Sequence, residues 1–227
     1  MKGRRRRSRR CSSASSEVAR KDRVLLYLVR HGETDWNRDR RIQGSTDIPL
    51  NDTGREQAAE TGRLLARRRW DAVITSPLSR AFETGAIIAG QLGLPTPSTD
   101  DDLVERHYGD AEGLNHRELA ERFPGDAAVP GRETREQVVA RVLPALVAIA
   151  QAHEGEAVVV VTHGGVIRSV LGAVDPGRDH PAIGNGSVHS FRFADGAFTL
   201  IAFDDPIEHL SERGEPLEEQ NPVEARG

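Results

Sequence analysis

Residues 24–32 read Val24-Leu25-Leu26-Tyr27-Leu28-Val29-Arg30-His31-Gly32. A continuous apolar run that ends abruptly in polar residues is typical of a β-strand buried on both faces. The pattern returns in Val158-Val159-Val160-Val161, which leads into Thr162-His163-Gly164-Gly165. A third strand is predicted over Asp71–Thr75, just before Ser76-Pro77.

Each predicted strand is followed by helical sequence. Thr53 with Glu56 fits a capping box and predicts a helix to about Arg69, and Thr134 with Gln137 predicts one to about His153, kinked at Pro144. Further helices are predicted over Leu114–Phe123 and from near Leu78 and Arg80. Alternating strands and helices predict an α/β fold, a three-layer α/β/α arrangement with a mostly parallel central sheet. Val188–Phe193 and Phe198–Phe203 flank a turn, which predicts an antiparallel hairpin at the C-terminal edge.

The 227 residues are enough for one domain, which we expect over residues 23–204. The longest apolar runs are far shorter than the ~20 residues of a membrane-spanning helix, so no membrane association is expected. The single cysteine, Cys11, allows neither an internal disulfide nor a cysteine metal cage, and a cytoplasmic protein is the default expectation.

Charge is unevenly distributed along the chain. The sequence holds 31 basic and 35 acidic residues, and residues 1–10 contain seven of the basic ones, which leaves 24 against 35, a formal charge of −11, for the remainder. Residues 1–22 are expected to form a disordered basic tail, and residues 205–227 an acidic flexible one. The basic tail could attract nucleic acid or an anionic membrane, but a solvated extension is the favoured interpretation.

Polar residues suited to phosphate chemistry follow the predicted buried strands: Arg30 and His31, then Ser76 and Arg80, then His163. In open α/β sheets ligands bind beyond the carboxyl ends of the strands, so these side chains are expected to converge. A guanidinium group can bind phosphoryl oxygens in a bidentate manner, through two N–H donors, and an imidazole can attack phosphorus. Taken singly, each residue is more often structural; their joint occurrence favours a phosphoryl site.

A metal site is the alternative for the two histidines. Arg30 next to His31 would repel a dication, and neither a His-x-x-x-His motif nor a carboxylate ligand pair accompanies them. We therefore predict neither a metal nor a cofactor.

The segment Leu28–Asn37 resembles the Arg-His-Gly signature of the histidine phosphatase (phosphoglycerate mutase-like) superfamily. The resemblance extends from about Val24 to Phe203, because further family motifs follow in order: Gln43-Gly44, Pro49-Leu50, Thr53-Gly54, Thr75 to Ala81, Glu105, and Thr162-His163-Gly164. It implies a metal-independent phosphomonoesterase that forms a phosphohistidine and acts on a small phosphorylated metabolite.

Roles follow residue by residue from the resemblance. His31 would be the nucleophile, Arg30, Arg80 and a protonated His163 would complete the phosphate pocket, and Glu105 would protonate the leaving oxygen and then activate water. The substrate-binding residues would be Asn37, Gln43, Gly44, Arg106, Tyr108 and Gly164. Charges on Arg30 and Arg80 are expected to keep His31 neutral.

Two family members share this chemistry, a phosphatase and a 2,3-bisphosphoglycerate-dependent phosphoglycerate mutase. Glu105–Gly109 with Gly113-Leu114-Asn115 resembles the mutase loop. Against the mutase, His116 replaces a lysine, Gly164-Gly165 replaces Gly-Asn, and the short 124–135 segment offers only Arg132 and Arg135 to grip a substrate carboxylate. The short-cap phosphatase branch is therefore favoured, with the mutase as the alternative.

A different class of function is a binding module that recruits nucleic acid through its basic tail. Every catalytic position is filled, so no feature of the sequence favours an inactive enzyme. The physiological substrate and the oligomeric state are left open.

Overall fold

The computed structural model describes residues 23–207, and these form a six-stranded sheet in the order β3-β2-β4-β1-β5-β6. The strands are β1 (Arg23–Arg30), β2 (Ala72–Thr75), β3 (Ser98–Thr99), β4 (Ala157–Thr162), β5 (Val188–Ala194) and β6 (Ala197–Ala202). β1, β2, β3 and β4 pair in parallel, whereas β5 runs antiparallel to both β1 and β6. The predicted mostly parallel sheet with an antiparallel edge hairpin is confirmed; the two-residue strand β3 was not predicted.

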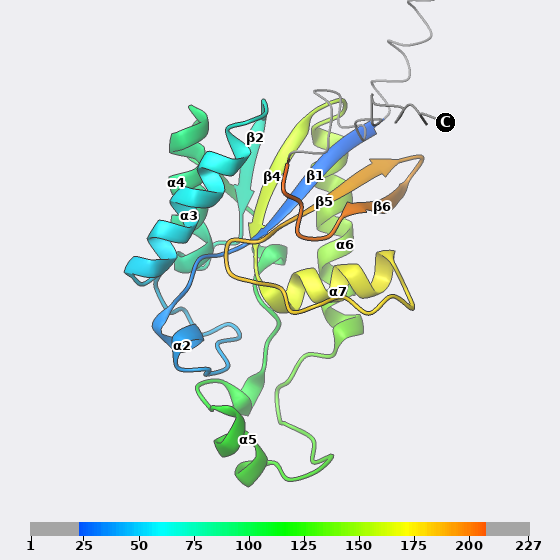
Figure 1. Cartoon of the computed structure of the whole chain (residues 1–227). Coiled ribbons are helices and arrows are strands. Elements are labelled where there is room, and N and C mark those ends of the chain that lie inside the picture. Colours follow the sequence, from blue (N-terminus) through cyan, green and yellow to red (C-terminus); the bar gives the residue numbers. More distant parts are fainter. Residues whose placement is uncertain (1–22, 208–227) are drawn as a thin grey trace, which may run out of the picture.

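Helices cover both faces of the sheet (Figure 1). They are α2 (Asp35–Arg38), α3 (Asp52–Leu65), α4 (Ser79–Leu92), α5 (His116–Arg122), α6 (Arg135–Ala152) and α7 (Gly164–Val174), with short 3₁₀ turns at Asp101–Leu103 and Gly109–Ala111. α3 and α4 lie on one face, α6 and α7 on the other, and α2 and α5 lie beyond the carboxyl ends of β1 and β4 (Figure 1). The three-layer architecture is as predicted.

Alternation along the central strands explains the three layers. Leu26 and Leu28 of β1 join the core cluster that contains side chains of α6 and α7, while Tyr27 and Val29 join the cluster with side chains of α3 and α4. β4 divides its valines in the same way. Because both faces are covered, the two strands are apolar without interruption, which is the pattern that the sequence displays.

The start of α3 differs from the prediction. Asn51, and not Thr53, is the N-cap, since its side chain accepts a hydrogen bond from the Gly54 N–H at 2.8 Å. The helix also ends at Leu65 rather than near Arg69. An Asn two residues upstream satisfies the same orphan N–H groups, so the Thr53 and Glu56 pair is not used as a capping box.

The start of α6 matches the prediction. Thr134 and Gln137 form the expected capping box, and the helix continues through Pro144 to Ala152. Pro144 therefore does not end the helix, and the kink at this residue stays a prediction.

The packed chain extends beyond the predicted domain end at residue 204. Asp205 and Ile207 are buried, and Asp205 accepts a hydrogen bond from Ser190 and donates its N–H to the Val188 carbonyl. The first residues of the predicted flexible tail therefore pack against β5. The predicted tails over residues 1–22 and 208–227 lie outside the described residues. Within residues 23–207, no helix is both long and apolar enough to cross a membrane.

Candidate active site

The residues predicted to bind phosphate meet at the carboxyl ends of the parallel strands. Arg30 ends β1 and His31 follows it, Ser76 follows β2, Arg80 lies in the first turn of α4, and His163 follows β4. A cavity of about 310 Å³ opens here. Nine of the eleven predicted site residues line it: Arg30, His31, Asn37, Gln43, Gly44, Arg80, Glu105, Tyr108 and Gly164.

The His31 imidazole is held in one tautomer. Its Nδ1 lies 2.6 Å from the Gly32 carbonyl oxygen, and because a carbonyl can only accept, Nδ1 must carry the proton. The side chain is 2% exposed, and burial, with smaller contributions from Arg80 and Arg30, holds its pKa well below the ordinary histidine range. The arginines act as predicted, but burial is the larger cause. The ring is therefore neutral, and the lone pair on Nε2 is available to a ligand.

Arg80 is fully buried, and both of its terminal nitrogens donate hydrogen bonds to backbone carbonyls. Nη1 donates to the Thr46 carbonyl at 2.9 Å and Nη2 to the Gly44 carbonyl at 2.7 Å. Arg30 Nη1 likewise donates to the Ile183 carbonyl at 2.6 Å. Burial lowers the pKa of both guanidinium groups, and Glu105 opposes that shift.

Three buried nitrogens at the site have no hydrogen-bond partner within residues 23–207: Arg30 Nε, Arg80 Nε and His163 Nδ1. A buried donor without a partner costs about 1–3 kcal/mol. A ligand with several acceptor oxygens would offset this cost, so the donor set fits an anion such as a phosphoryl group.

His163 is fully buried beside His31. The two rings are 5.1 Å apart, and His163 Nε2 lies 2.8 Å from the Ser76 hydroxyl. Burial first, and then Arg80, holds the pKa of His163 well below its ordinary value. This direction favours a neutral imidazole, because an imidazolium would have no solvent and would face two guanidinium groups. The protonated His163 that is expected during phosphoryl transfer stays a prediction.

Asn37 presents its amide to the cavity in a fixed orientation. Its Oδ1 accepts from the Thr34 N–H and from Asn185 Nδ2, each at 3.2 Å. Because Asn37 Oδ1 already accepts these hydrogen bonds, the Nδ2 group of Asn37 is the part of the amide that can donate to a ligand in the cavity. Asn185 also donates to the His31 carbonyl at 3.0 Å, which ties this loop to the end of β1.

Glu105 lies against the N-terminus of α7. Its carboxylate accepts from the N–H groups of Gly165 at 3.0 Å, Val166 at 3.2 Å and Arg106 at 2.7 Å. A Cβ built on Gly165 would lie 2.5 Å from Glu105 Oε1, so only glycine leaves room for the carboxylate here. The side chain is buried yet lines the cavity.

Tyr108 closes one side of the cavity between two arginines. The Arg106 and Arg132 guanidinium carbons lie 5.3 Å and 5.5 Å from its ring centroid. Arg106 itself is not among the cavity-lining residues, since its Nε donates to the Glu133 carbonyl at 2.6 Å. Its contact in the structure is with Tyr108, and its direct contact with substrate stays a prediction. Neither Arg132 nor Arg135 lines the cavity.

Sequence reasoning missed two arginines that line the cavity, Arg41 and Arg168. Arg41 donates to the Gly113 carbonyl at 2.7 Å and pairs with Glu118 at 3.0 Å. Arg168 donates to the carbonyls of His180 and Pro181. A signal existed for Arg168, since helical sequence is expected after each buried strand and Arg168 lies four residues after Gly164, which places both on one face of α7. Arg41 and Asn185 lie in irregular segments, where no periodicity places a side chain.

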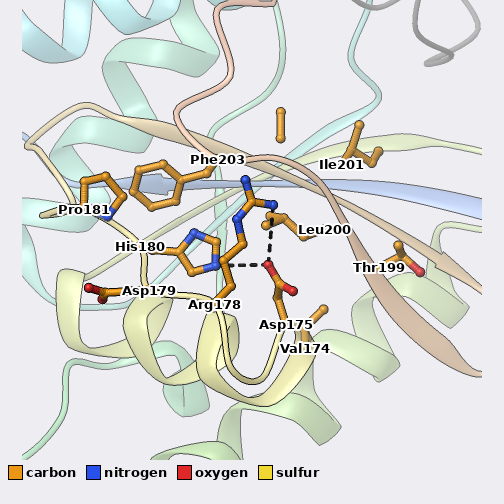
Figure 2. A pocket seen from close by; sticks show the side chains of 11 residues that line it. Val174, Asp175, Arg178, Asp179, His180, Pro181, Thr199, Leu200, Ile201 and Phe203 are labelled. Carbon is orange, nitrogen blue, oxygen red and sulfur yellow. Dashed lines mark ion pairs between the residues drawn. The ribbon is translucent and has the colours of Figure 1, made fainter.

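A second cavity of about 570 Å³ lies behind the segment that Arg168 holds. Figure 2 shows His180 and Arg178 directed at Asp175, with Phe203 beside the imidazole. Asp175 lies 3.2 Å from His180 Nε2 and 3.9 Å from Arg178 Nη1. None of the predicted site residues lines this cavity. His180 and Pro181 line it, whereas the next two residues, Ala182 and Ile183, line the candidate active site.

The family model of the histidine phosphatase superfamily (branch 1) matches residues 26–206. The chain belongs to this superfamily. It is 41% identical over 206 residues, 85% of this chain and 90% of the relative, to phosphoglycerate mutase-like protein 4 of Arabidopsis thaliana. It is 42% identical over 175 residues, 76% of this chain and 90% of the relative, to the uncharacterized phosphatase PhoE of Bacillus subtilis.

A third relative is the metal-independent phosphoserine phosphatase of Arabidopsis thaliana, 37% identical over 83% of this chain and 84% of its own length. Among solved structures, a mycobacterial glucosyl-3-phosphoglycerate phosphatase superposes with a TM-score of 0.71 at 28% identity, covering 80% of this chain and 99% of that one. The family predicted from the ordered motifs is thus confirmed.

Proposed function

We propose that this protein hydrolyses phosphomonoesters of small metabolites through a phosphohistidine on Nε2 of His31. One observation carries the proposal most: the Nδ1–H of a neutral, buried His31 is donated to the Gly32 carbonyl, which leaves the Nε2 lone pair at the cavity beside two arginines. A nucleophile needs a free lone pair, and a phosphoryl group needs positive charge around it.

In the first step, His31 Nε2 attacks phosphorus and the bond from phosphorus to the ester oxygen breaks. Glu105, which lines the same cavity, gives a proton to the departing oxygen, so the product leaves as an alcohol. In the second step, Glu105 takes a proton from water as the water oxygen attacks phosphorus. The bond from phosphorus to Nε2 breaks, and inorganic phosphate leaves.

The cavity supplies the charge that the transferring group requires. Arg30 Nε, Arg80 Nε, Asn37 Nδ2 and His163 Nδ1 are proposed to donate to the phosphoryl oxygens, where negative charge accumulates during transfer. With these donors the reaction needs no metal ion, and one relative carries the words metal-independent in its name. Treatment with a chelator is therefore expected to leave the rate unchanged.

The phosphoglycerate mutase activity is the alternative, favoured by the loop at Glu105–Gly109 and by the relative named phosphoglycerate mutase-like. Two features support the phosphatase instead. Arg132 and Arg135, the candidates for gripping a substrate carboxylate, lie outside the cavity lining. Gly165 stands where the mutases carry asparagine, and the space that a side chain would fill at this position is occupied by the Glu105 carboxylate.

The test is to measure phosphate release from a panel of phosphomonoesters that includes phosphoserine and 3-phosphoglycerate. Conversion of 3-phosphoglycerate to 2-phosphoglycerate with a bisphosphoglycerate primer is measured in parallel. Fast release with little isomerisation would support the phosphatase, and fast isomerisation would support the mutase.

The nucleophile is tested with His31→Ala and by acid-quench mass spectrometry of the wild-type protein during turnover. We expect a phosphoryl group on His31 in the wild-type protein and loss of turnover in the variant with its fold retained. Substantial activity of His31→Ala would exclude this mechanism.

A further inference from the structure

The peptide group that holds the His31 imidazole is itself held by a side chain of α3. The Gly32 carbonyl accepts the Nδ1–H of His31, and the N–H of the same peptide group, which belongs to Glu33, donates to Gln57 Oε1 at 2.8 Å. Hydrogen bonds in such a chain polarise one another, by perhaps about 10–30% per bond. Gln57 therefore makes the Gly32 carbonyl a better acceptor for the Nδ1–H.

The peptide group on the other side of Gly32 is held by α4. The Gly32 N–H donates to Thr84 Oγ1 at 3.1 Å, and the same hydroxyl donates to the Arg80 carbonyl at 2.7 Å. Thr84 is fully buried. One hydroxyl thus connects the turn after His31 with the helical turn that carries Arg80.

Close backbone packing fixes this turn against α3. A Cβ on Gly32 would lie 2.2 Å from the Gly54 carbonyl oxygen, and one on Gly54 would lie 2.1 Å from the Glu33 carbonyl oxygen. The Glu33 carbonyl also accepts the Asn51 N–H at 3.1 Å. This packing limits movement of the turn as a whole, while the hydrogen bonds of Gln57 and Thr84 engage the two individual peptide groups of Gly32.

We propose that Gln57 and Thr84 are positioning residues that keep His31 in the Nδ1–H tautomer by fixing the two peptide groups of Gly32. Gln57 is not among the residues that line the active-site cavity, and Thr84 is not either. Both act through the backbone and not on substrate. The catalytic consequence rests on the proposed role of His31 as nucleophile, whereas the tautomer itself can be measured without any substrate.

The primary experiment is ¹⁵N NMR of imidazole-labelled full-length protein at neutral pH, with the His31 resonances assigned by their absence in His31→Ala. The wild-type protein is expected to show the Nδ1–H tautomer. Gln57→Leu removes the acceptor at similar volume and is expected to give a mixture with the Nε2–H form. Gln57→Glu keeps an acceptor oxygen and is expected to retain the wild-type tautomer.

Kinetics provide the second measurement. A net hydrogen bond of about 0.5–1.5 kcal/mol corresponds to a change of about 2- to 10-fold, so Gln57→Leu is expected to lower kcat by that factor with KM within about twofold of wild type. Gln57→Glu is expected to stay within about twofold of wild type in both. An unchanged tautomer in Gln57→Leu, or an equal kcat loss in Gln57→Glu, would overturn the proposal.

The pair Thr84→Val and Thr84→Ser repeats the test from α4, in case Gln57→Leu does not fold. Valine keeps the shape of threonine without the acceptor, and serine keeps the acceptor. Thr84→Val is expected to give a mixture of tautomers and a lower kcat, and Thr84→Ser is expected to behave like the wild-type protein. Equal behaviour of the two variants would overturn the role of Thr84. Activity in His31→Ala would remove the proposed function while leaving the tautomer result standing.

Discussion

At the scale of single residues, the site depends on which atoms are already engaged within the protein. Nη1 of Arg30 and both terminal nitrogens of Arg80 donate to backbone carbonyls, and the Nε of each arginine has no hydrogen-bond partner within residues 23–207. Glu105 is placed by the N–H groups of Gly165 and Val166. The chemistry of each group therefore follows from hydrogen bonds that already exist around it.

Glu105→Gln removes the proton donor and base while keeping the side-chain shape. We expect the rate for esters with poor leaving groups to fall by about 10²–10⁴-fold, because these need protonation of the leaving oxygen. Formation of the phosphohistidine from an activated aryl phosphate should be much less affected. Equal losses in this step for both ester classes would contradict the proposed role.

Gly165→Ala tests how Glu105 is placed. A Cβ at this position would push the carboxylate away from the helix N-terminus, because the clashing atom is the movable end of a side chain. The variant should fold and should reproduce the leaving-group dependence of Glu105→Gln in weaker form. Gly172→Ala is the matched control on the same helix, since a Cβ there meets nothing within 4 Å. A leaving-group profile like that of wild type in Gly165→Ala would count against the inferred clash.

At the scale of elements, helix ends and strand ends set the positions of the proposed catalytic groups. The N-terminal turn of α3 contacts the loop after His31, and α4 brings Arg80 to the same edge of the sheet. Apolar runs and polar strand ends predicted β1, β2 and β4 well, because a strand covered on both faces has a distinctive sequence. The predicted start of α3 was wrong, because Asn51 and Thr53 are both favourable N-cap residues. The hydrogen bond from the Asn51 side chain to the Glu33 carboxylate, which favours Asn51, cannot be seen in the sequence.

Asn51→Ala and Thr53→Ala separate the two candidate caps. Asn51 makes the capping bond and also donates to the Glu33 carboxylate at 2.9 Å, whereas Thr53 is exposed. We expect Asn51→Ala to lower the free energy of unfolding by about 1 kcal/mol and Thr53→Ala by less than about 0.5 kcal/mol. Urea denaturation of both variants measures the difference, and the reverse order would refute the assignment of the N-cap.

The parts of the site that could not be predicted lie where the chain is irregular. His31, Arg80 and His163 are marked by strand ends and by ordered motifs, so their convergence was predictable. Asn185 and the carbonyls of residues 180–183 come from the long connection between α7 and β5, which has no periodic pattern. Burial was also invisible in the sequence, and it is the main reason that both histidines are neutral.

At the scale of the whole molecule, the fold buries three histidines that cannot easily be protonated, His31, His163 and His189. Burial, with smaller effects from His180 and Arg168, lowers the pKa of His189 to about 4. Its Nδ1 accepts the Asp204 N–H, which requires an unprotonated nitrogen. In the unfolded chain the same residue has an ordinary pKa near 6.5.

Stability should therefore fall as the pH is lowered from 7 towards 5. In that window the unfolded chain binds protons that the folded His189 does not, which costs the folded state about 2 kcal/mol at pH 5 for this residue. His189→Gln removes this contribution and should lose less stability than wild type between pH 7 and pH 5, measured by urea unfolding. Identical pH dependence of the two proteins would contradict the assignment.

The segment between α7 and β5 gives a way to observe the site without chemistry. Its carbonyls at His180, Pro181 and Ile183 are held by Arg168 and Arg30, both of which face the cavity. An anion bound in the cavity would attract these two guanidinium groups and so change the strength of their hydrogen bonds to the segment. The rate of proteolytic cleavage within residues 178–186 should accordingly report whether inorganic phosphate occupies the cavity.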